Sequence, residues 1–437
     1  MSALDLQLRE ALSRAPLLER RGRVIRAYGT TIHATGLRAS IGQACEIVDP
    51  VSGEHIPAEV IGLGDDFAIL TPLAPLHGLA AGAEVVVGPA RTEIEVGAGL
   101  LGRCVDAHGR PLDGLGPIAG ERWRQPLYAS APNPLERAPI SEPFPTGVRV
   151  IDALLTVGRG QRIGVFAAAG GGKSTLLGMM ARHCEADVAV IALIGERGRE
   201  VREFIEDALG STGLKRAVVV ISTADRPAME RVRAAHAAAA MAEGFRDQGA
   251  RVLLMMDSVT RFARALREVG LAVGEPAVRR GFPPSVFAEL PRLFERAGAA
   301  RTGAITAVYT VLLEDEDAAD PIGEEVRSIL DGHVYLSRRL GDAGRYPAVD
   351  VLASLSRVFP RVTDAGQRAA AQRVRAWLAK YAEIEFLLQI GEYKPGGDAL
   401  ADEAIRRMPA LEALLRQTPE ESEPFAATLA KLQEVAA

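Results

Sequence analysis

The chain has 437 residues, enough for two or three domains with a full-sized core. It carries 51 Lys and Arg against 56 Asp and Glu, and this net charge of −5 gives no reason to expect a nucleic-acid partner. Its three cysteines, Cys45, Cys104 and Cys184, form no C-x-x-C pair, which fits a reducing compartment. No secretion signal is recognisable, and no apolar run approaches the roughly 20 residues of a membrane span. The composition predicts a cytoplasmic protein, at most peripheral to a membrane.

The N-terminal part of the chain reads as a short helix followed by a small β-domain. Residues 3–20 place leucines among charges at roughly helical spacing, so 1–20 is expected to form an amphipathic helix. That helix could pack on the next domain or bind a partner, and the pattern favours neither. Residues 21–92 consist of short alternating runs, such as RVIRAY and AEVVVG, broken by Gly and Pro. Several short strands at close spacing predict a small β-barrel or sandwich.

The middle and the end of the chain show a different pattern of apolar and polar residues. After a stretch rich in Gly and Pro come strongly apolar segments, read as strands: GVRVIDALL, RIGVFAA, ADVAVIALIG, AVVVIST, RVLLMMD and GAITAVYTVLL. Long helical patterns separate most of them, which predicts a parallel sheet covered by helices over 93–360. Residues 361–437 show only helical periodicity. The expected fold is therefore an α/β core with a small N-terminal β-barrel and a C-terminal helical domain.

The segment 162–177, RIGVFAAAGGGKSTLL, has the layout of a P-loop. An apolar strand leads into a glycine-rich turn whose N–H groups can wrap phosphate oxygens, and the N-terminus of the next helix attracts the same charge. Lys173 is expected to reach the β- and γ-phosphates and Ser174 to offer its hydroxyl to Mg²⁺. The residues predicted to surround the nucleotide phosphates are Ala168, Ala169, Gly170, Gly171, Gly172, Lys173, Ser174 and Thr175.

The match departs from the pattern G-x-x-x-x-G-K-[ST] at its first position, where Ala167 replaces Gly. A methyl group is tolerated there if φ stays negative, and the three glycines still supply the tight part of the turn. A glycine-rich turn with a chance Lys-Ser pair remains the alternative for this segment alone.

Two further segments place acids at the ends of predicted strands. RVLLMMD ends at Asp257, where a carboxylate downstream of a P-loop would support Mg²⁺. DVAVIALIG runs into Glu196-Arg197-Gly198-Arg199-Glu200, at the edge where α/β sheets bind ligands. A carboxylate there could polarise an attacking water, and an arginine could neutralise charge on the transferred group. A charged helix N-terminus, where acids are favoured anyway, is the alternative.

Together these stretches resemble the catalytic subunits of rotary ATPases, and especially the homohexameric export ATPases of bacterial type III secretion systems and flagella. The resemblance rests on the P-loop and on LIGERGREVREF, MMDSVTRFARALRE, GFPPSVFAELPRLFERAG, DPIGEEVRSILDGHVYLSR and RYPAVDVLASLSRV. It covers most of the chain and is weakest in the first 20 residues and beyond about 400. It implies a RecA-like core and a Mg²⁺-dependent ATPase, with the injectisome branch favoured.

The resemblance also implies roles for single residues. Lys173 and Ser174 correspond to the ligands of phosphate and Mg²⁺, with Asp257 supporting the metal. Glu196 corresponds to the carboxylate that activates water. The remaining matches are Arg197 and Arg261 as arginines near the γ-phosphate, Tyr346 as the aromatic residue that stacks on adenine, and Arg357 as the arginine finger acting on nucleotide held by the neighbouring subunit.

Both Glu196 and Arg357 occur in this one chain. In rotary ATPases that alternate two kinds of chain, the two roles belong mainly to different chains, so their joint presence favours a homohexameric ring. The expected partners are secretion-apparatus stator or stalk proteins and complexes of chaperones with export substrates, without nucleic acid. The expected place is the cytoplasm, peripheral at the inner membrane.

Other functions remain as alternatives to a motor that couples ATP hydrolysis to chaperone release and to the unfolding and export of substrate proteins. The chain could be a flagellar export ATPase. An ion-translocating ATP synthase subunit is less favoured because Glu196 and Arg357 share one chain. A hexameric RNA helicase should carry basic and aromatic residues in its small N-terminal domain, where only Tyr28 and Phe67 are aromatic. A ring subunit without enzymatic activity is disfavoured because the predicted catalytic residues are intact.

Overall fold

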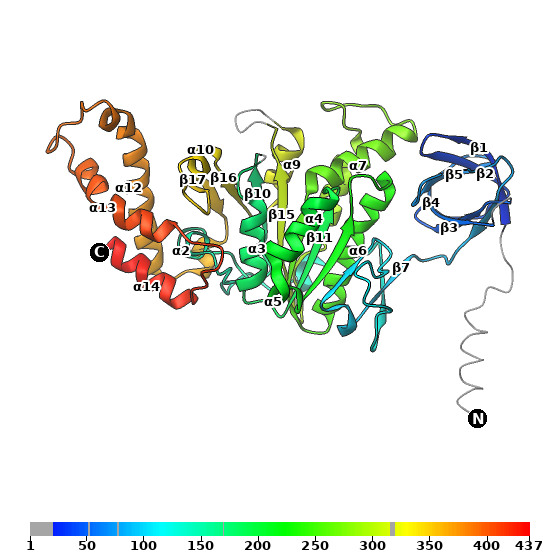
Figure 1. The fold of residues 1–437 in the computed structure, drawn as a ribbon, viewed down its shortest axis with the longest axis horizontal. Helices are drawn as coiled ribbons and strands as arrows, with labels where there is room; N and C mark the ends of the chain where they lie inside the picture. Colours follow the sequence, from blue (N-terminus) through cyan, green and yellow to red (C-terminus); the bar gives the residue numbers. More distant parts are fainter. Residues whose placement is uncertain (1–20, 51–52, 77, 169, 315–319) are drawn as a thin grey trace, which may run out of the picture. The chain divides into compact units, whose positions relative to one another are not determined.

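The computed structural model describes residues 21–50, 53–76, 78–168, 170–314 and 320–437 (Figure 1). The helix predicted over 1–20 lies outside the described residues. The chain divides into two compact units, which are described separately. The first is built from the residues up to Thr92 with two short later segments, 226–230 and 268–276, and the second contains the rest.

The first unit contains a closed six-stranded barrel, as the alternating runs predict. Its strands pair in the order β1-β2-β5-β4-β3-β6, and every pair is antiparallel. Alternate side chains point inward, and Ile32, Ile47, Val60, Leu70 and Val85 are fully buried. The strands are β1 (Arg21–Tyr28), β2 (Thr31–Thr35), β3 (Ala44–Val48), β4 (His55–Leu63), β5 (Phe67–Pro72) and β6 (Glu84–Val87).

The second unit is built on a mainly parallel sheet, which confirms the predicted α/β fold class. The strand order is β17-β16-β10-β15-β13-β11-β12-β8; β17 runs antiparallel to β16, and β14 (Gly298–Ala299) runs antiparallel to β15. All seven residues of β11 are buried, as expected for a strand covered on both faces. The path comprises β8 (Arg103–Val105), β10 (Arg162–Ala167), β11 (Val188–Ile194), β12 (Ala217–Ser222), β13 (Arg251–Asp257), β15 (Ala304–Leu312), β16 (Gly332–Leu336) and β17 (Val349–Ser356).

Helices connect these strands, and in the described part of the chain four more follow β17. The C-terminal helices α12 (Ala365–Gln389), α13 (Ala399–Leu415) and α14 (Phe425–Ala436) pack against one another (Figure 1). No helix in the described part of the chain is both long and apolar enough to cross a membrane. The other helices are α3 (Lys173–His183), α4 (Gly198–Glu203), the π-helix η3 (Phe204–Leu209), α5 (Gly210–Leu214), α6 (Ala228–Asp247), α7 (Val259–Ala272), α8 (Pro284–Phe294), α9 (Pro321–Ile329), α10 (Arg338–Asp342) and α11 (Phe359–Val362).

A short region before the P-loop differs from its predicted structure. The apolar run GVRVIDALL, read as a strand, contains instead the helix α2 (Arg149–Leu154). All six residues of α2 are buried, including Arg149 and Asp152, so the helix has no solvent-exposed face, and six residues are too few to show a helical period. The Asp152 carboxylate accepts hydrogen bonds from the backbone N–H groups of Thr146 (2.8 Å) and Gly147 (3.0 Å), which holds the turn that precedes the helix.

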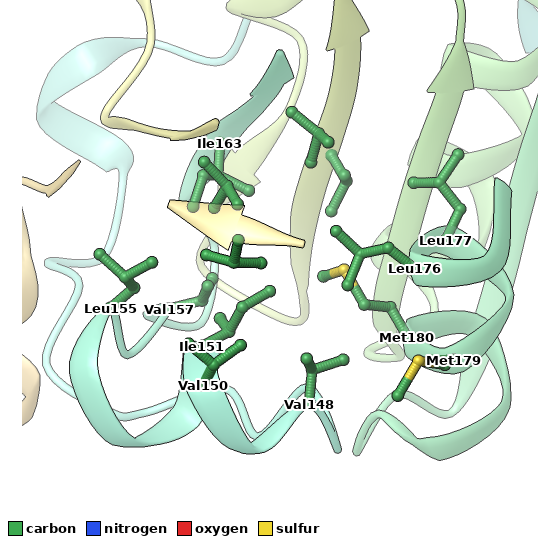
Figure 2. Close-up of a cluster of buried hydrophobic side chains, with 14 of the residues drawn as sticks. Val148, Val150, Ile151, Leu155, Val157, Ile163, Leu176, Leu177, Met179 and Met180 are labelled. Carbon is green, nitrogen blue, oxygen red and sulfur yellow. The ribbon is translucent and has the colours of Figure 1, made fainter. Parts of the chain in front are cut away.

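The largest hydrophobic cluster lies where α2 and α3 approach the sheet. Figure 2 shows side chains of the segment 148–157, of Ile163 at the start of β10, and of α3 facing one another. Buried residues of the C-terminal helices, such as Val374 and Leu411, belong to the same cluster. The helix α3, which follows the P-loop, is therefore held in place by packing against one continuous hydrophobic core.

Candidate active site

The P-loop turn connects β10 to α3 and has the backbone that its glycines allow. Gly170 has φ of 84° and Gly172 has φ of 78°, a left-handed region that other residues rarely adopt. Gly172 caps α3, so the orphan N–H groups of the first helical turn face the loop. Ala167, which replaces the expected glycine, is a buried β10 residue in regular register, where a methyl group fits. Ala169 lies outside the described residues.

A cavity of about 270 Å³ opens above this turn and gathers most of the predicted site residues. They come from the P-loop, from the carboxyl ends of β11 and β13, and from α7. Gly171 lies inside the turn, where its N–H donates to the Ala168 carbonyl at 3.3 Å. The cavity is lined by Ala168, Gly170, Gly172, Lys173, Ser174, Thr175, Leu193, Glu196, Glu200, Val201, Phe204, Asp257, Arg261 and Leu312.

Four charged side chains meet in this cavity. Lys173 Nζ forms an ion pair with Asp257 Oδ1 and lies 3.7 Å from Glu196 Oε1. Arg261 Nη2 lies 3.1 Å from Glu196 Oε2 and holds it from the other side. The side chains of Lys173, Glu196 and Asp257 are 12%, 9% and 4% exposed, so these charges interact with little screening by water. The sheet thus brings together groups that lie up to 88 residues apart in the sequence.

Glu196 has the electrostatics of a general base. Burial and the negative charge of Asp257 raise the pKa of Glu196 to about 7, against the opposing effect of Lys173 and Arg261. Glu196 Oε1 is buried and has no hydrogen-bond partner among the described residues. Such an acceptor costs stability of about 1–3 kcal/mol. A carboxylate with a free lone pair and a near-neutral pKa can take a proton from a bound water.

Asp257 is held in place by a residue that the sequence did not single out. Thr310, on the neighbouring strand β15, has its hydroxyl 2.8 Å from Asp257 Oδ1 and 3.2 Å from the Met256 carbonyl. Thr310 is fully buried, so its hydroxyl depends on these partners. The signal in the sequence was slight: a lone threonine within the apolar run AVYTVLL.

Oxygen donors suited to Mg²⁺ are present in the same cavity. The Ser174 hydroxyl and the Asp257 carboxylate both line it. Mg²⁺ prefers oxygen ligands and usually binds through one or two protein groups together with substrate phosphates and waters. The donor set therefore fits the predicted metal.

Two of the predicted arginines lie away from this cluster. The Arg197 side chain is 75% exposed and pairs with Glu200 at 3.3 Å. Arg357 follows β17 at one edge of the sheet, is exposed, and its Nη2 donates to the Arg327 carbonyl at 3.4 Å. Neither residue lines the cavity of its own chain.

Tyr346 lies on the other side of the P-loop, beside a second cavity of about 380 Å³. A Cβ on Gly172 would be 3.4 Å from the Tyr346 ring, so the ring lies directly against the turn. Gln417 and Pro419, from the segment after α13, also line this cavity. No sequence pattern points to these two residues, because only the tertiary fold brings the C-terminal segment to the P-loop.

Two family models match parts of this chain. Residues 147–356 match the ATP synthase alpha/beta family, nucleotide-binding domain, and residues 363–434 match the T3SS EscN ATPase C-terminal domain. The first match contains the P-loop, Glu196, Asp257 and Tyr346. The second covers the C-terminal helices.

The similarity extends over nearly the whole chain. A type 3 secretion system ATPase of Xanthomonas euvesicatoria is 52% identical over 99% of this chain and 98% of its own length. A flagellum-specific ATP synthase of Pseudomonas aeruginosa is 49% identical over 97% of this chain and 94% of its own. The assembled ATPase EscN, solved with its central stalk EscO from enteropathogenic E. coli, has a TM-score of 0.88 at 46% identity and covers 95% of this chain and 100% of that one. The chain belongs to the family of type 3 secretion system ATPases.

Proposed function

We propose that this chain is the ATP-hydrolysing motor of a bacterial type III protein secretion system. The observation that carries the proposal is the meeting of Lys173, Glu196, Asp257 and Arg261 in one cavity above the P-loop. This arrangement supplies a phosphate ligand, a base for water and a carboxylate for a metal. These are the parts that phosphoryl transfer to water requires.

Each residue has a distinct role in the proposed reaction. The P-loop N–H groups and the Lys173 ammonium bind the phosphate oxygens and stabilise the charge that develops on them. Glu196 accepts the proton of the attacking water, and Arg261 orients the Glu196 carboxylate from the opposite side. Ser174 and Asp257 are the residues that would hold Mg²⁺, which would supply positive charge to stabilise the transferred phosphoryl group.

The positions of Arg357 and Arg197 support a ring of identical subunits. Arg357 is exposed at a sheet edge, outside the cavity of its own chain. An arginine placed in this way can act on nucleotide bound by a neighbouring subunit, as arginine fingers do. The relative EscN is described as an assembled ATPase. We infer a homohexamer in which each chain completes the site of the next. Arg197, which is 75% exposed beside Glu200, is proposed to lie near the γ-phosphate in such a completed site.

The biological role follows from the family. In the proposed function, hydrolysis releases chaperones from export substrates and unfolds those substrates for secretion. EscN binds a central stalk, EscO, and a stalk or stator protein is the corresponding partner proposed here. The proposed location is the cytoplasmic face of the inner membrane.

The proposed domains are the helix over 1–20, the barrel over 21–92, the ATPase core over 93–360 and the helical domain over 361–437.

The proposal is tested by hydrolysis and by secretion together. The purified chain should hydrolyse ATP with Mg²⁺ and lose activity in excess EDTA. Lys173→Ala should abolish turnover, because the lost ammonium stabilises the transition state by several kcal/mol. Normal turnover by this variant would refute the P-loop assignment.

A cell-based comparison then separates the injectisome role from the flagellar role. The flagellum-specific relative is nearly as similar as the secretion relative, so a flagellar role is the second candidate. Deleting the gene should stop effector secretion while leaving motility intact. Loss of motility with normal effector secretion would favour the flagellar role.

A further inference from the structure

The segment that carries Glu196 continues into a π-helix. From the end of β11 the chain enters α4 and then η3, where the Gly210 N–H donates to the Ile205 carbonyl, five residues earlier. π-helices are rare and occur frequently at functional sites, and a π-turn changes the course of the helix that contains it. The contacts that fix η3 therefore also fix the course of α4, which follows Glu196 and carries Glu200.

Arg182, in the last turn of α3, bonds to the backbone carbonyls of η3. Its Nη1 donates to the Ala208 carbonyl at 2.7 Å and to the Asp207 carbonyl at 3.4 Å. Its Nη2 donates to the Pro419 carbonyl at 2.5 Å, so the C-terminal segment holds the guanidinium from another side. The planar guanidinium carries five N–H donors in a fixed fork. One side chain therefore connects the helix after the P-loop to both segments.

The backbones of α3 and η3 are in contact beside Arg182. Gly178 lies four residues before Arg182, on the same face of α3. A Cβ on Gly178 would lie 2.5 Å from the Ala208 carbonyl oxygen and 2.8 Å from Ala208 Cβ, closer than side-chain atoms pack. The two helices therefore meet at Ala208, and the Arg182 hydrogen bonds stabilise that contact.

Nearer the P-loop, the same elements are separated by a cavity of about 360 Å³. Ser174 and Thr175, at the start of α3, line it on one side, and Glu200 and Phe204 line it on the other. These four residues also line the phosphate cavity. Because open space lies between the start of α3 and α4, the separation of the two helices here depends on the contact at Ala208 and Arg182 farther along.

We propose that Arg182 is a positioning residue for hydrolysis, which holds η3 against α3 and thereby places the Glu196 carboxylate relative to the P-loop. Arg182 does not line the phosphate cavity, so it acts through the Glu196 segment and not on the nucleotide. The inference rests on the proposed function and adds to it a residue on which the chemical step depends. A displacement of about 1 Å can lower the rate of a catalysed step by about 10²-fold. Loss of Arg182 should therefore slow the chemical step more than it weakens nucleotide binding.

The test replaces Arg182 by Met, which keeps a long apolar stem and removes every donor. With the purified full-length chain and Mg²⁺, single-turnover hydrolysis of ATP should slow by about 10- to 100-fold, while the Kd for ATP stays within about threefold of the wild type. Arg182→Lys keeps the charge but loses the fork, so its rate should be intermediate.

Wild-type hydrolysis by folded Arg182→Met, or by Arg182→Lys where the Met variant does not fold, would show that the inference is wrong while the proposed function stands. If the wild-type chain does not hydrolyse ATP, the proposed function fails and the inference with it.

A double substitution separates positioning of Glu196 from general stabilisation. Combined with Glu196→Gln, Arg182→Met should slow hydrolysis by no more than about threefold further, because the carboxylate that Arg182 positions is already absent. If the two losses are additive instead, Arg182 does not act through Glu196 and the inference is overturned.

Arg216→Met is the matched control for Arg182→Met. The Arg216 guanidinium also bonds backbone carbonyls at the end of α3, but it lines neither cavity. Its acceptors are the carbonyls of Ala181, Cys184 and Ala186. The control should lower the thermal unfolding midpoint and leave the single-turnover rate unchanged. Equal slowing by both variants would contradict a specific role for Arg182.

Discussion

Replacing Thr310 by Val removes a hydroxyl that bonds the buried Asp257 carboxylate. The two side chains have nearly the same shape, so the packing of β15 should change little. The hydroxyl lies 2.8 Å from Asp257 Oδ1 and both residues are buried, so the substitution leaves that carboxylate oxygen with one hydrogen-bond donor fewer. The variant therefore isolates one hydrogen bond at the proposed metal carboxylate.

The size of the effect follows from that bond. A hydrogen bond to a charged group contributes about 1.5–3 kcal/mol. If this hydrogen-bond energy serves to hold Asp257 in its productive orientation, its loss lowers kcat/KM by roughly 10- to 150-fold, at about 1.4 kcal/mol for each factor of ten. Since Asp257 is proposed to support Mg²⁺, the Mg²⁺ concentration needed for half-maximal rate should rise as well.

Steady-state ATP hydrolysis, measured as a function of Mg²⁺ concentration, is the assay. Thr306→Val is a matched control, because Thr306 lies on the same strand, is equally buried, and its hydroxyl accepts from the Gly160 N–H at 3.0 Å. The control should lose stability without a change in Mg²⁺ dependence. If Thr310→Val keeps the wild-type rate and Mg²⁺ dependence, the reasoning about Asp257 is refuted.

Further predictions concern the ring and acid stability. Arg357→Ala and Lys173→Ala chains, each inactive alone, should recover part of the activity when mixed, because some interfaces then contain both groups; confirmed mixed rings without recovery would show that Arg357 does not act between subunits. The Arg103 guanidinium, 2.8 Å from Asp113 Oδ2, holds the pKa of that carboxyl well below its usual range. The wild type should therefore be more stable than Asp113→Asn at pH 7, and urea unfolding should show this advantage shrinking as the pH falls below about 4, the unfolded value. An advantage independent of pH would contradict the ion-pair explanation.

The parts of the site that are local in sequence could be predicted well. The P-loop, Glu196 and Asp257 each follow an apolar strand, and parallel strands bring their carboxyl ends to one edge of the sheet. That rule alone places Lys173 near both acids. The barrel could be predicted equally well, since burial of only one face of each strand leaves a clear alternation of apolar and polar residues in the sequence.

Other features depend on contacts that no short pattern records. The helix α2 is short and all of its residues are buried, so its sequence shows no clear helical period and reads as a strand. Gln417 reaches Gly147 across 270 residues, and Thr310 reaches Asp257 across 53. Such partners are fixed by packing of the whole unit, so a short sequence pattern does not identify them.

Glu196 is the base that activates water in the proposed reaction, and Glu196→Gln tests this role most directly. The amide keeps the shape of the carboxylate and cannot accept a proton from water. Titration should give a Kd for ATP near that of the wild type, while single-turnover hydrolysis should slow by about 10²–10⁴-fold. Wild-type hydrolysis by this variant, or loss of ATP binding with no separate effect on the chemical step, would contradict the proposed role of Glu196.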